Sequence, residues 1–197
     1  MHNLEQQLAF IRELDRLKSV YRQSLVKSDK NRFENSAEHS WHICLIAQVL
    51  KEYADEPIDI DRVVRMLLVH DIVEIDAGDT FAFAASTDLG EQLGKELKAV
   101  ERIFGLLPDH QREEFVALWM EFEEGNTYES RYAKAIDRVV PVFMNLVNDG
   151  GGWRRHTLSR SQLLKRNAYL QSAMPRLWDF LVSQINEAVS RGWLQPD

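Results

Sequence analysis

Apolar residues recur every three or four positions along most of this chain, which is the spacing that places them on one face of an α-helix. The first such run predicts a helix from Leu4 to about Arg22. Similar runs predict further helices at 36–54, 62–77, 89–107, 109–124, from 126 or 127 onward, 161–173 and 175–191. The alternating pattern that marks strands is lacking, and the connections are short and polar. The sequence therefore predicts an all-α single domain.

Several local signals set the expected ends of these helices. Ser36 and either Asp59 or Asp61 are suitable N-caps for the second and third helices. The polar stretch 27–35 predicts a loop, and so do residues 80–87. Gly150 to Gly152 also predict a loop, but not a phosphate-binding one, because no strand precedes them and no Gly-Lys-Ser/Thr follows. Trp153 is expected at the surface or in a dimer contact.

The helix predicted at 62–77 is apolar nearly all round, and this pattern is typical of a buried helix. It nevertheless carries His70, Asp71 and Glu74 in the sequence L-L-V-H-D-I-V-E-I-D-A-G-D. Ionisable groups in such a position must be paired, neutralised or bound to a metal, because an isolated buried charge is very unfavourable. His70 and Asp71 point about 100° apart on a helix and can reach one ion from the same side. A hydrogen-bonded structural His-Asp pair is the alternative.

A metal site at this helix needs about two more ligands. One histidine occurs upstream in Glu38-His39-Ser40-Trp41-His42, and one carboxylate occurs downstream in Ala135-Ile136-Asp137-Arg138. A mixed imidazole and carboxylate set suits Mn, Fe, Co, Ni or Zn. The lack of thiolate ligands argues against a structural zinc site.

The order of these residues, His39, then His70-Asp71, then Asp137, resembles that of the HD-domain metal-dependent phosphohydrolases. The surrounding words E-N-S-A-E-H-S-W, H-D-I-V-E-I-D-A-G-D and A-K-A-I-D-R are similar to the branch that contains 5'-deoxynucleotidases and oxetanocin-type HD hydrolases. The resemblance runs from about residue 14 to 146. It implies a single HD domain over 1–197, an orthogonal helical bundle that is commonly a homodimer, and one divalent transition metal ion held by these four ligands. Helices within 158–192 are expected to pack on the bundle or on the dimer interface.

The same resemblance implies a phosphomonoesterase that acts on deoxynucleoside 5'-monophosphates. Glu74, one helical turn from His70 and Asp71, is expected to orient or deprotonate the attacking water. Asp79 matches a position that contacts the substrate sugar. Arg22 matches the arginine of an Arg-Trp pair that contacts the nucleotide, whereas Gln23 stands where that pair has tryptophan. Arg32 is either a solvated loop charge or a contact to the phosphate.

Composition narrows the range of partners and compartments. The formal charge of −7 and the pI near 5.4 argue against a duplex nucleic-acid binder, but a metal ion still allows a small anionic substrate such as a nucleotide. Cys44 is the single cysteine, so no intrachain disulfide forms and a cytoplasmic protein is expected. No signal peptide is evident, and no apolar stretch reaches the roughly 18 residues that span a bilayer.

Three other functions are compatible with the residues. One is hydrolysis of another phosphate ester, a nucleoside triphosphate or a cyclic nucleotide, which the departure at Gln23 leaves open. Alternatively, the chain is a metal- or nucleotide-binding regulatory module with little turnover, although Glu74 and Asp79 beside the four ligands disfavour this. The last alternative is a helical structural protein with an incidental metal site.

Overall fold

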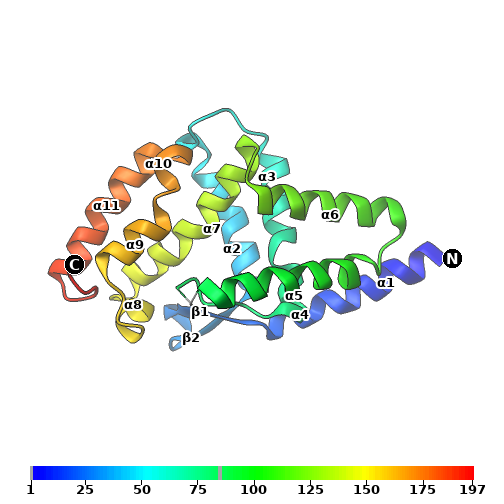
Figure 1. The fold of residues 1–197 in the computed structure, drawn as a ribbon, viewed down its shortest axis with the longest axis horizontal. Helices are drawn as coiled ribbons and strands as arrows, with labels where there is room; N and C mark the ends of the chain where they lie inside the picture. The colour runs from blue at the N-terminus through cyan, green and yellow to red at the C-terminus, as the bar shows by residue number, and fades with distance from the viewer. Residues whose placement is uncertain (1, 84–85) are drawn as a thin grey trace.

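The computed structural model describes residues 2–83 and 86–197, and most of them are helical (Figure 1). The longer helices are α1 (His2–Leu14), α2 (Ser36–Val49), α3 (Ile60–Val69), α5 (Ser86–Phe104), α6 (Asp109–Glu124), α7 (Tyr128–Val147), α9 (Arg160–Asn167) and α11 (Pro175–Ser190). Short α-helical segments are α4 (Glu74–Ala77), α8 (Gly151–Arg155) and α10 (Leu170–Ala173). Short 3-10 segments are η1 (Asp15–Ser19), η2 (Lys27–Asp29), η3 (Lys51–Tyr53) and η4 (His70–Val73). The predicted all-α class is confirmed.

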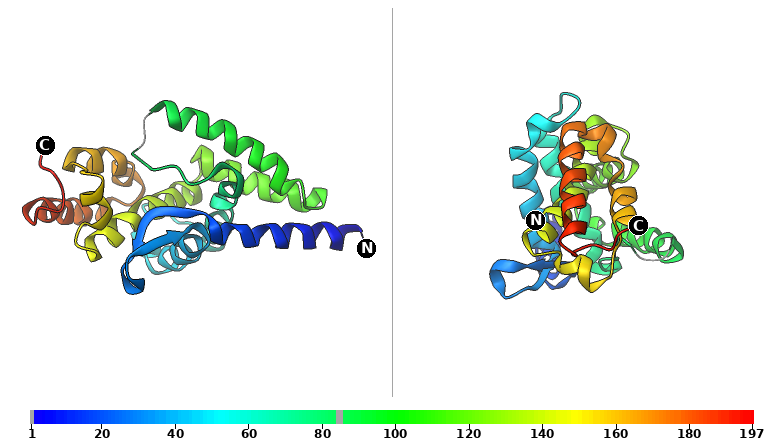
Figure 2. Two further views of the ribbon diagram at one scale, coloured as in Figure 1. Left: turned by 90° about the horizontal axis from the view of Figure 1, so that it is seen from below. Right: turned by 90° about the vertical axis from the view of Figure 1, so that its left-hand side faces the viewer.

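Three helices form the centre of the molecule. α3 packs against both α2 and α7, and α6 packs on α3 and α7. Their facing side chains are fully buried, as Ile43, Met66 and Ile136 show with 0% exposure. α1 extends away from this centre and α5 packs on α4, which is visible from two directions (Figure 2). The central helices therefore supply the rigid frame for residues 60–77, which contain His70 and Asp71 and are called the HD segment below.

The prediction of one helix from Leu4 to Arg22 and a loop at 27–35 was wrong. α1 ends at Leu14, and the chain then forms strand β1 (Tyr21–Val26) and strand β2 (Arg32–Asn35), which pair antiparallel. The turn between them contains Lys30 and Asn31 with positive φ, a conformation that asparagine tolerates well. The hairpin brings Arg22 out of the helical pattern and onto a strand that packs against α7.

The HD segment is not one continuous helix as predicted. α3 ends at Val69, the 3-10 segment η4 follows, and α4 closes the segment before Gly78, whose φ is +76°. Asp59, one of the two predicted candidates, caps α3 by accepting hydrogen bonds from the backbone N–H groups of Asp61 and Arg62. The N-cap of α2 is Asn35 and not Ser36; its side chain bonds the backbone of Glu38 in a capping box. Asn35 thereby frees the Ser36 hydroxyl for the site described below.

The C-terminal helices pack on the bundle of their own chain. α9 and α10 contact α7, and α11 contacts both of them. Leu163, Leu170 and Leu181 in these helices are at most 1% exposed. The predicted helix 161–173 is divided into α9 and α10, and a turn of α8 replaces the loop expected at the glycines. Trp153 in α8 is 4% exposed, so the expected surface position was wrong: the side chain fills the space beside α7.

Two further expectations concern the remainder of the chain. Of the loop expected at 80–87, Ala84 and Ala85 lie outside the described residues, and α5 already begins at Ser86. α7 continues past Pro141 to Val147. Among the helices of residues 2–83 and 86–197, none combines the length and the apolar character needed to cross a membrane.

Candidate metal centre and active site

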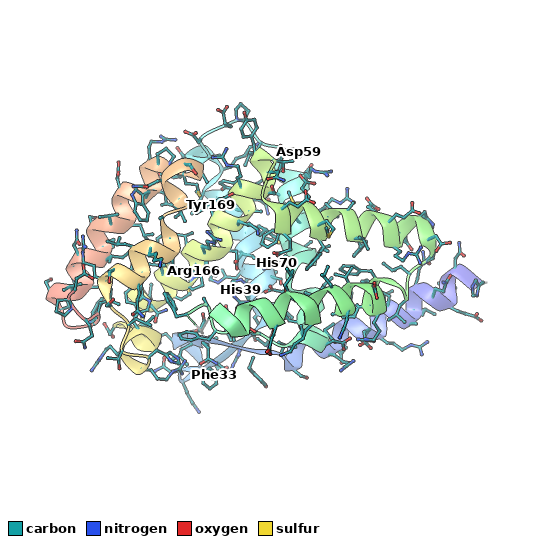
Figure 3. All side chains as sticks on the ribbon, viewed as in Figure 1. Phe33, His39, Asp59, His70, Arg166 and Tyr169 are labelled. Carbon is teal, nitrogen blue, oxygen red and sulfur yellow. The ribbon has the colours of Figure 1, made fainter. Side chains whose placement is uncertain are left out.

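Two histidines and one carboxylate from three helices converge near the middle of the molecule (Figure 3). They are His39 from the first turn of α2, His70 at the start of η4 and Asp137 in α7. One ligand atom from each lies within 4.8 Å of the other two, and both histidines are buried. The α2, α3 and α7 packing described above is therefore what brings together residues far apart in sequence.

His70 is arranged with one ring nitrogen held and the other free. Its Nδ1 lies 2.8 Å from the Leu67 carbonyl, to which it donates. Nε2 is buried and has no hydrogen bond within residues 2–83 and 86–197, although it lies 2.9 Å from Asp71 Oδ1 and 3.8 Å from Asp137 Oδ1. A buried ring nitrogen normally has a partner. A backbone bond at one nitrogen that leaves the other free toward carboxylates is the arrangement found in metal-ligating histidines.

His39 and Asp137 contact each other directly. His39 Nε2 lies 3.0 Å from Asp137 Oδ1, and its Nδ1 lies 3.5 Å from the buried carboxylate of Glu34. Burial by itself raises the pKa of Asp137, but the hydrogen bond from His39 and the nearby imidazole of His70 outweigh it and hold that pKa well below its usual range. Asp137 is therefore negatively charged and can bind a cation without first losing a proton. These donor groups fit a divalent transition metal ion.

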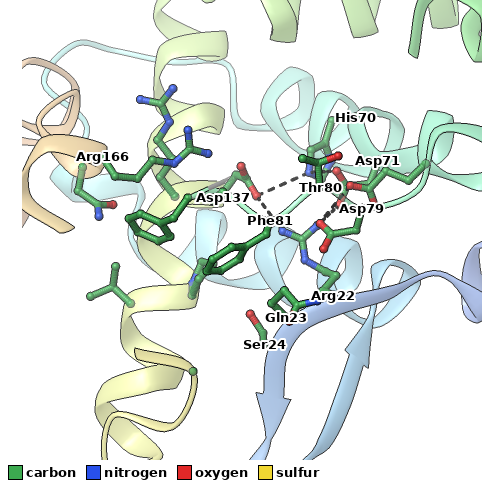
Figure 4. Close-up of a pocket in the computed structure, with 18 of the residues that line it drawn as sticks. Arg22, Gln23, Ser24, His70, Asp71, Asp79, Thr80, Phe81, Asp137 and Arg166 are labelled. Carbon is green, nitrogen blue, oxygen red and sulfur yellow. Dashed lines mark hydrogen bonds and ion pairs between the residues drawn. The ribbon is translucent and has the colours of Figure 1, made fainter. Parts of the chain in front are cut away.

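Asp71 is beside this cluster and is neutralised by Arg22. Arg22 donates to Asp71 over 2.8 Å and lies within 4.0 Å of the carboxylates of Glu74, Asp79 and Asp137 (Figure 4). The Arg22 side chain is only 13% exposed, and these four charges raise its pKa above the ordinary value in spite of burial. The β1 strand therefore delivers one guanidinium to the middle of an acidic group.

Glu74 is buried one turn beyond His70, with Ser36 as its hydrogen-bond donor. The Ser36 hydroxyl lies 2.6 Å from Glu74 Oε2. Burial raises the pKa of Glu74 well above its ordinary value, the negative charge of Asp71 raises it further, and Arg22 opposes both. Glu74 is consequently a carboxyl group that holds a proton more strongly than a solvated glutamate.

A cavity of about 280 Å³ opens directly onto these groups. Its acidic wall includes His70, Asp71, Glu74, Asp79 and Asp137. Further lining residues come from the hairpin, from the segment after α4, from α7 and from the C-terminal part of the chain. The predicted metal ligands and the predicted general base thus lie in or beside one cavity.

Asp79 and its aromatic neighbours line the mouth of this cavity. Burial raises the pKa of Asp79, while Arg22 acts against that shift. Phe81 and Phe83 both line the cavity, and Phe81 packs against His156 with ring centroids 4.2 Å apart. The two phenylalanines therefore give this part of the cavity wall an apolar surface.

Arg32 does not lie with the other predicted site residues. Its guanidinium is exposed and donates to both carboxylate oxygens of Glu38 and to Asp29. It lines a separate surface hollow together with Trp41 and His42. Of the two candidate phosphate contacts, therefore, only Arg22 reaches the cavity.

Sequence reasoning missed several cavity residues. Ser36 was assigned only a capping role, and Glu34 none, although both contact the site. Trp119, Phe122, Arg166 and Asn167 also line the cavity and come from distant segments. For Glu34 and Ser36, the one signal in the sequence was the word E-N-S-A-E-H, which places both within five residues of His39.

Comparison with known proteins agrees with this geometry. The family model for the HD domain matches residues 14–178. The chain belongs to the HD domain family. A crystal structure of a predicted metal-dependent phosphohydrolase from Magnetospirillum magnetotacticum MS-1 superposes with a TM-score of 0.92 at 44% identity, covering 98% of this chain and 96% of that one. The HD-type helical fold is thereby confirmed.

Two more distant likenesses complete the comparison. The human 5'-deoxynucleotidase HDDC2 is 33% identical over 137 residues, which are 70% of this chain. The chain spans 65% of that relative's length and 64% of the mouse protein's, slightly less than two thirds. The PH0347 protein of Pyrococcus horikoshii OT3 shares the fold with a TM-score of 0.61 at 17% identity, covering 91% of this chain and 98% of that one.

Proposed function

We propose that this HD protein is a metal-dependent phosphomonoesterase whose substrates are deoxynucleoside 5'-monophosphates. The observation that carries the proposal is the cluster of the buried His39 and His70 with the half-buried Asp137, which opens into a cavity that also holds Glu74. Support for the substrate class comes from relatives named 5'-deoxynucleotidase. The neighbour described as a metal-dependent phosphohydrolase supports the reaction type.

In this proposal His39, His70, Asp71 and Asp137 hold one divalent ion. When bound, such an ion polarises a phosphate oxygen and lowers the pKa of a bound water. Asp71 is included because it adjoins His70 and matches the family order, although its charge is balanced by Arg22 in the absence of an ion. Mn, Fe, Co, Ni and Zn all suit this donor set.

Glu74 is the proposed general base. Its buried position raises its pKa well above that of a solvated glutamate, which makes it a stronger proton acceptor. Ser36 fixes one of its oxygens, so the other is left to receive a proton from the attacking water. The carboxylate is thus oriented before any substrate enters.

The sugar and phosphate contacts are proposed from the remaining cavity residues. Asp79 is the proposed acceptor for a sugar hydroxyl, and Phe81 offers an apolar face at the cavity mouth. Arg22 stays a proposed substrate contact because it lines the same cavity. Of the two roles considered for Arg32, we propose the solvated loop charge and not the substrate contact, since Glu38 and Asp29 already bind its guanidinium.

Three statements about the whole protein belong to the same proposal. We propose a single HD domain over residues 1–197, which the match to residues 14–178 supports. A homodimer is supported by an apolar stripe on the surface of α2. It consists of Trp41, Leu45 and Val49, whose exposed fractions are 63%, 44% and 74%. A cytoplasmic location is supported by the free thiol of Cys44.

The decisive experiment measures phosphate release from a panel of deoxy- and ribonucleoside monophosphates and other phosphate esters. The protein is first treated with EDTA and then supplied with Mn, Co, Ni or Zn. We expect metal-restored release from deoxynucleoside 5'-monophosphates, with little from the ribo and 3' compounds. Release from another ester alone would replace the substrate class. Metal binding without release from any compound would favour a regulatory module, and a protein that binds no metal would contradict the proposal altogether.

A further inference from the structure

The charges that line the cavity are not evenly compensated. At the acidic end, Arg22 lies within 4.0 Å of all four carboxylates, those of Asp71, Glu74, Asp79 and Asp137. The positive charge of Arg22 is therefore largely balanced before a ligand enters. A phosphate group carries up to two negative charges and needs positive charge that is not already in use.

The opposite side of the cavity supplies such charge. Arg138 from α7 and Arg166 from α9 both line the cavity. Within the part of the chain that the structure describes, neither has a carboxylate oxygen within 4.0 Å. Arg138 lies instead over the ring of Tyr169, 4.9 Å from its centroid, which orients the guanidinium without neutralising it.

Arg166 approaches Asp137 from the side opposite His70 and Asp71 (Figure 4). Loss of hydration lowers the pKa of Arg166, the nearby charge of Arg138 lowers it further, and Asp137 acts in the other direction. The two guanidinium groups are thus close enough to repel each other. Two like charges at one cavity wall are stabilised when an anion lies between or beside them.

A second, independent observation points to a ligand at this wall. Asn167 is 2% exposed and lines the cavity, and its Nδ2 donates to the Leu163 carbonyl. Its Oδ1 is buried and has no hydrogen-bond partner among the residues that the structure describes. Because buried polar atoms are almost always hydrogen-bonded, this acceptor calls for a donor from whatever occupies the cavity.

We propose that Arg138 and Arg166 form a phosphate-binding subsite, with Asn167 Oδ1 accepting a hydrogen bond from a hydroxyl or amine of the same ligand. The proposal deepens the proposed function, on which it rests for the identity of the anion as a substrate phosphate. Arginine suits this role because its planar guanidinium makes paired hydrogen bonds to phosphate oxygens. The phosphate is either the one released or a second one on the same nucleotide.

The test measures the dissociation constant of inorganic phosphate by calorimetry on the metal-loaded protein. The variants are Arg166→Ala, Arg138→Ala and Arg166→Lys, and the matched control is Lys165→Ala, an exposed neighbour in α9 that does not line the cavity. Metal content and circular dichroism are recorded for each, so that altered folding or metal loss is recognised. We expect Arg166→Ala to weaken phosphate binding roughly ten- to hundredfold. Arg138→Ala should weaken it less, Arg166→Lys should restore part of it, and Lys165→Ala should leave it unchanged.

The two sources of phosphate are separated by titrating a nucleoside 5'-monophosphate and a nucleoside 3',5'-bisphosphate. Weaker binding of both in Arg166→Ala assigns the released phosphate to the subsite, and weaker binding of the bisphosphate alone assigns a second phosphate. Unchanged affinity for all three ligands in the Arg138→Ala, Arg166→Ala double variant would overturn the subsite. The nucleotide titrations are made in a Glu74→Gln background, in which hydrolysis of the 5'-monophosphate is expected to be lost, so the result stands apart from the phosphate-release panel. If the wild type releases phosphate but ligand binding does not depend on the two arginines, only the subsite is refuted. If ligand binding depends on the arginines but no phosphate is released, only the proposed activity is refuted.

Discussion

The two ends of the cavity hold charge in opposite ways. At the acidic end, carboxylates and histidines from α2, η4, α4 and α7 are buried together, and one guanidinium from β1 balances them. At the other end, two arginines on α7 and α9 have no carboxylate within 4.0 Å among the described residues. Exposure explains much of the difference. Asp71 and Glu74 are buried and need a counter-charge, whereas Arg138 is half-buried and Arg166 is exposed, so water can stabilise their charges without a carboxylate partner.

This comparison teaches where a ligand gains most. A cation binds favourably at the acidic end because it takes over the role of Arg22 as counter-charge. An anion binds favourably at the basic end because, among the described residues, no carboxylate has to be displaced from the two arginines. Substitutions at the two ends should therefore differ in kind. Loss of an acidic-end residue should affect metal binding, turnover or stability, whereas loss of a basic-end arginine should affect phosphate binding. Loss of a residue outside the cavity should affect none of these.

The largest effect is expected for Asp137→Ala. Removing this carboxylate takes away a predicted ligand and leaves His39 without its 3.0 Å partner. Metal affinity should fall by more than about a hundredfold, because even residues that only orient ligands contribute ten- to hundredfold. Metal analysis of purified protein checks this, with the exposed Asp179→Ala as the control. Equal metal content in both variants would defeat the ligand assignment.

Glu74→Gln should keep the metal and lose turnover. Without a proton acceptor, kcat should fall by about 10² to 10⁴. Because burial and Asp71 raise the pKa of Glu74, the wild-type rate should increase with pH as this group loses its proton, and the variant should lack that increase. The measurement is kcat against pH together with metal content. Undiminished hydrolysis in the variant would remove Glu74 from its role.

Arg22→Ala should affect stability more in the metal-free protein than in the metal-loaded one. Its removal leaves buried carboxylates without compensation, for which the expected loss is about 3–5 kcal/mol in the free energy of unfolding. A bound cation replaces part of that charge, so the loss should shrink on metal loading. Urea unfolding of both forms provides the measurement. An identical loss in the two forms would mean that Arg22 does not act as a counter-charge.

The smallest effect is expected for Arg32→Ala. Its ion pairs with Asp29 and Glu38 are exposed, and Glu38 keeps its place in the capping box of α2 without them. The thermal midpoint and the KM for nucleotide should both remain at wild-type values. A marked rise in KM would show that Arg32 contacts substrate and that the cavity extends past the hairpin.

The cluster could be predicted because its residues stand out locally. His70 and Asp71 interrupt an apolar helix, and burying ionisable groups is unfavourable unless they are paired, neutralised or bound to a metal. His39 and Asp137 required the family order, since nothing in local spacing links α2 with α7. Their convergence in the structure agrees with that order, while their role as ligands remains a prediction.

The hairpin and the basic end could not be predicted from local pattern. β1 and β2 are short, and their pairing depends on contacts with α7 and α8 that helical periodicity does not report. Arg166 resembles any surface arginine of an amphipathic helix, and only the packing of α9 on α7 brings it to the cavity. Charges that are functional through tertiary packing alone have no signature in one sequence.

The positions of the tryptophans give the protein optical probes of its own. Trp119 and Trp153 are 1% and 4% exposed, and both line the cavity. Trp41, 63% exposed, lies on α2 away from it. Acrylamide should quench the emission of Trp41 first, whereas a ligand that enters the cavity should alter the emission of the shielded pair. Intrinsic fluorescence can therefore follow occupancy of the cavity in the unlabelled protein.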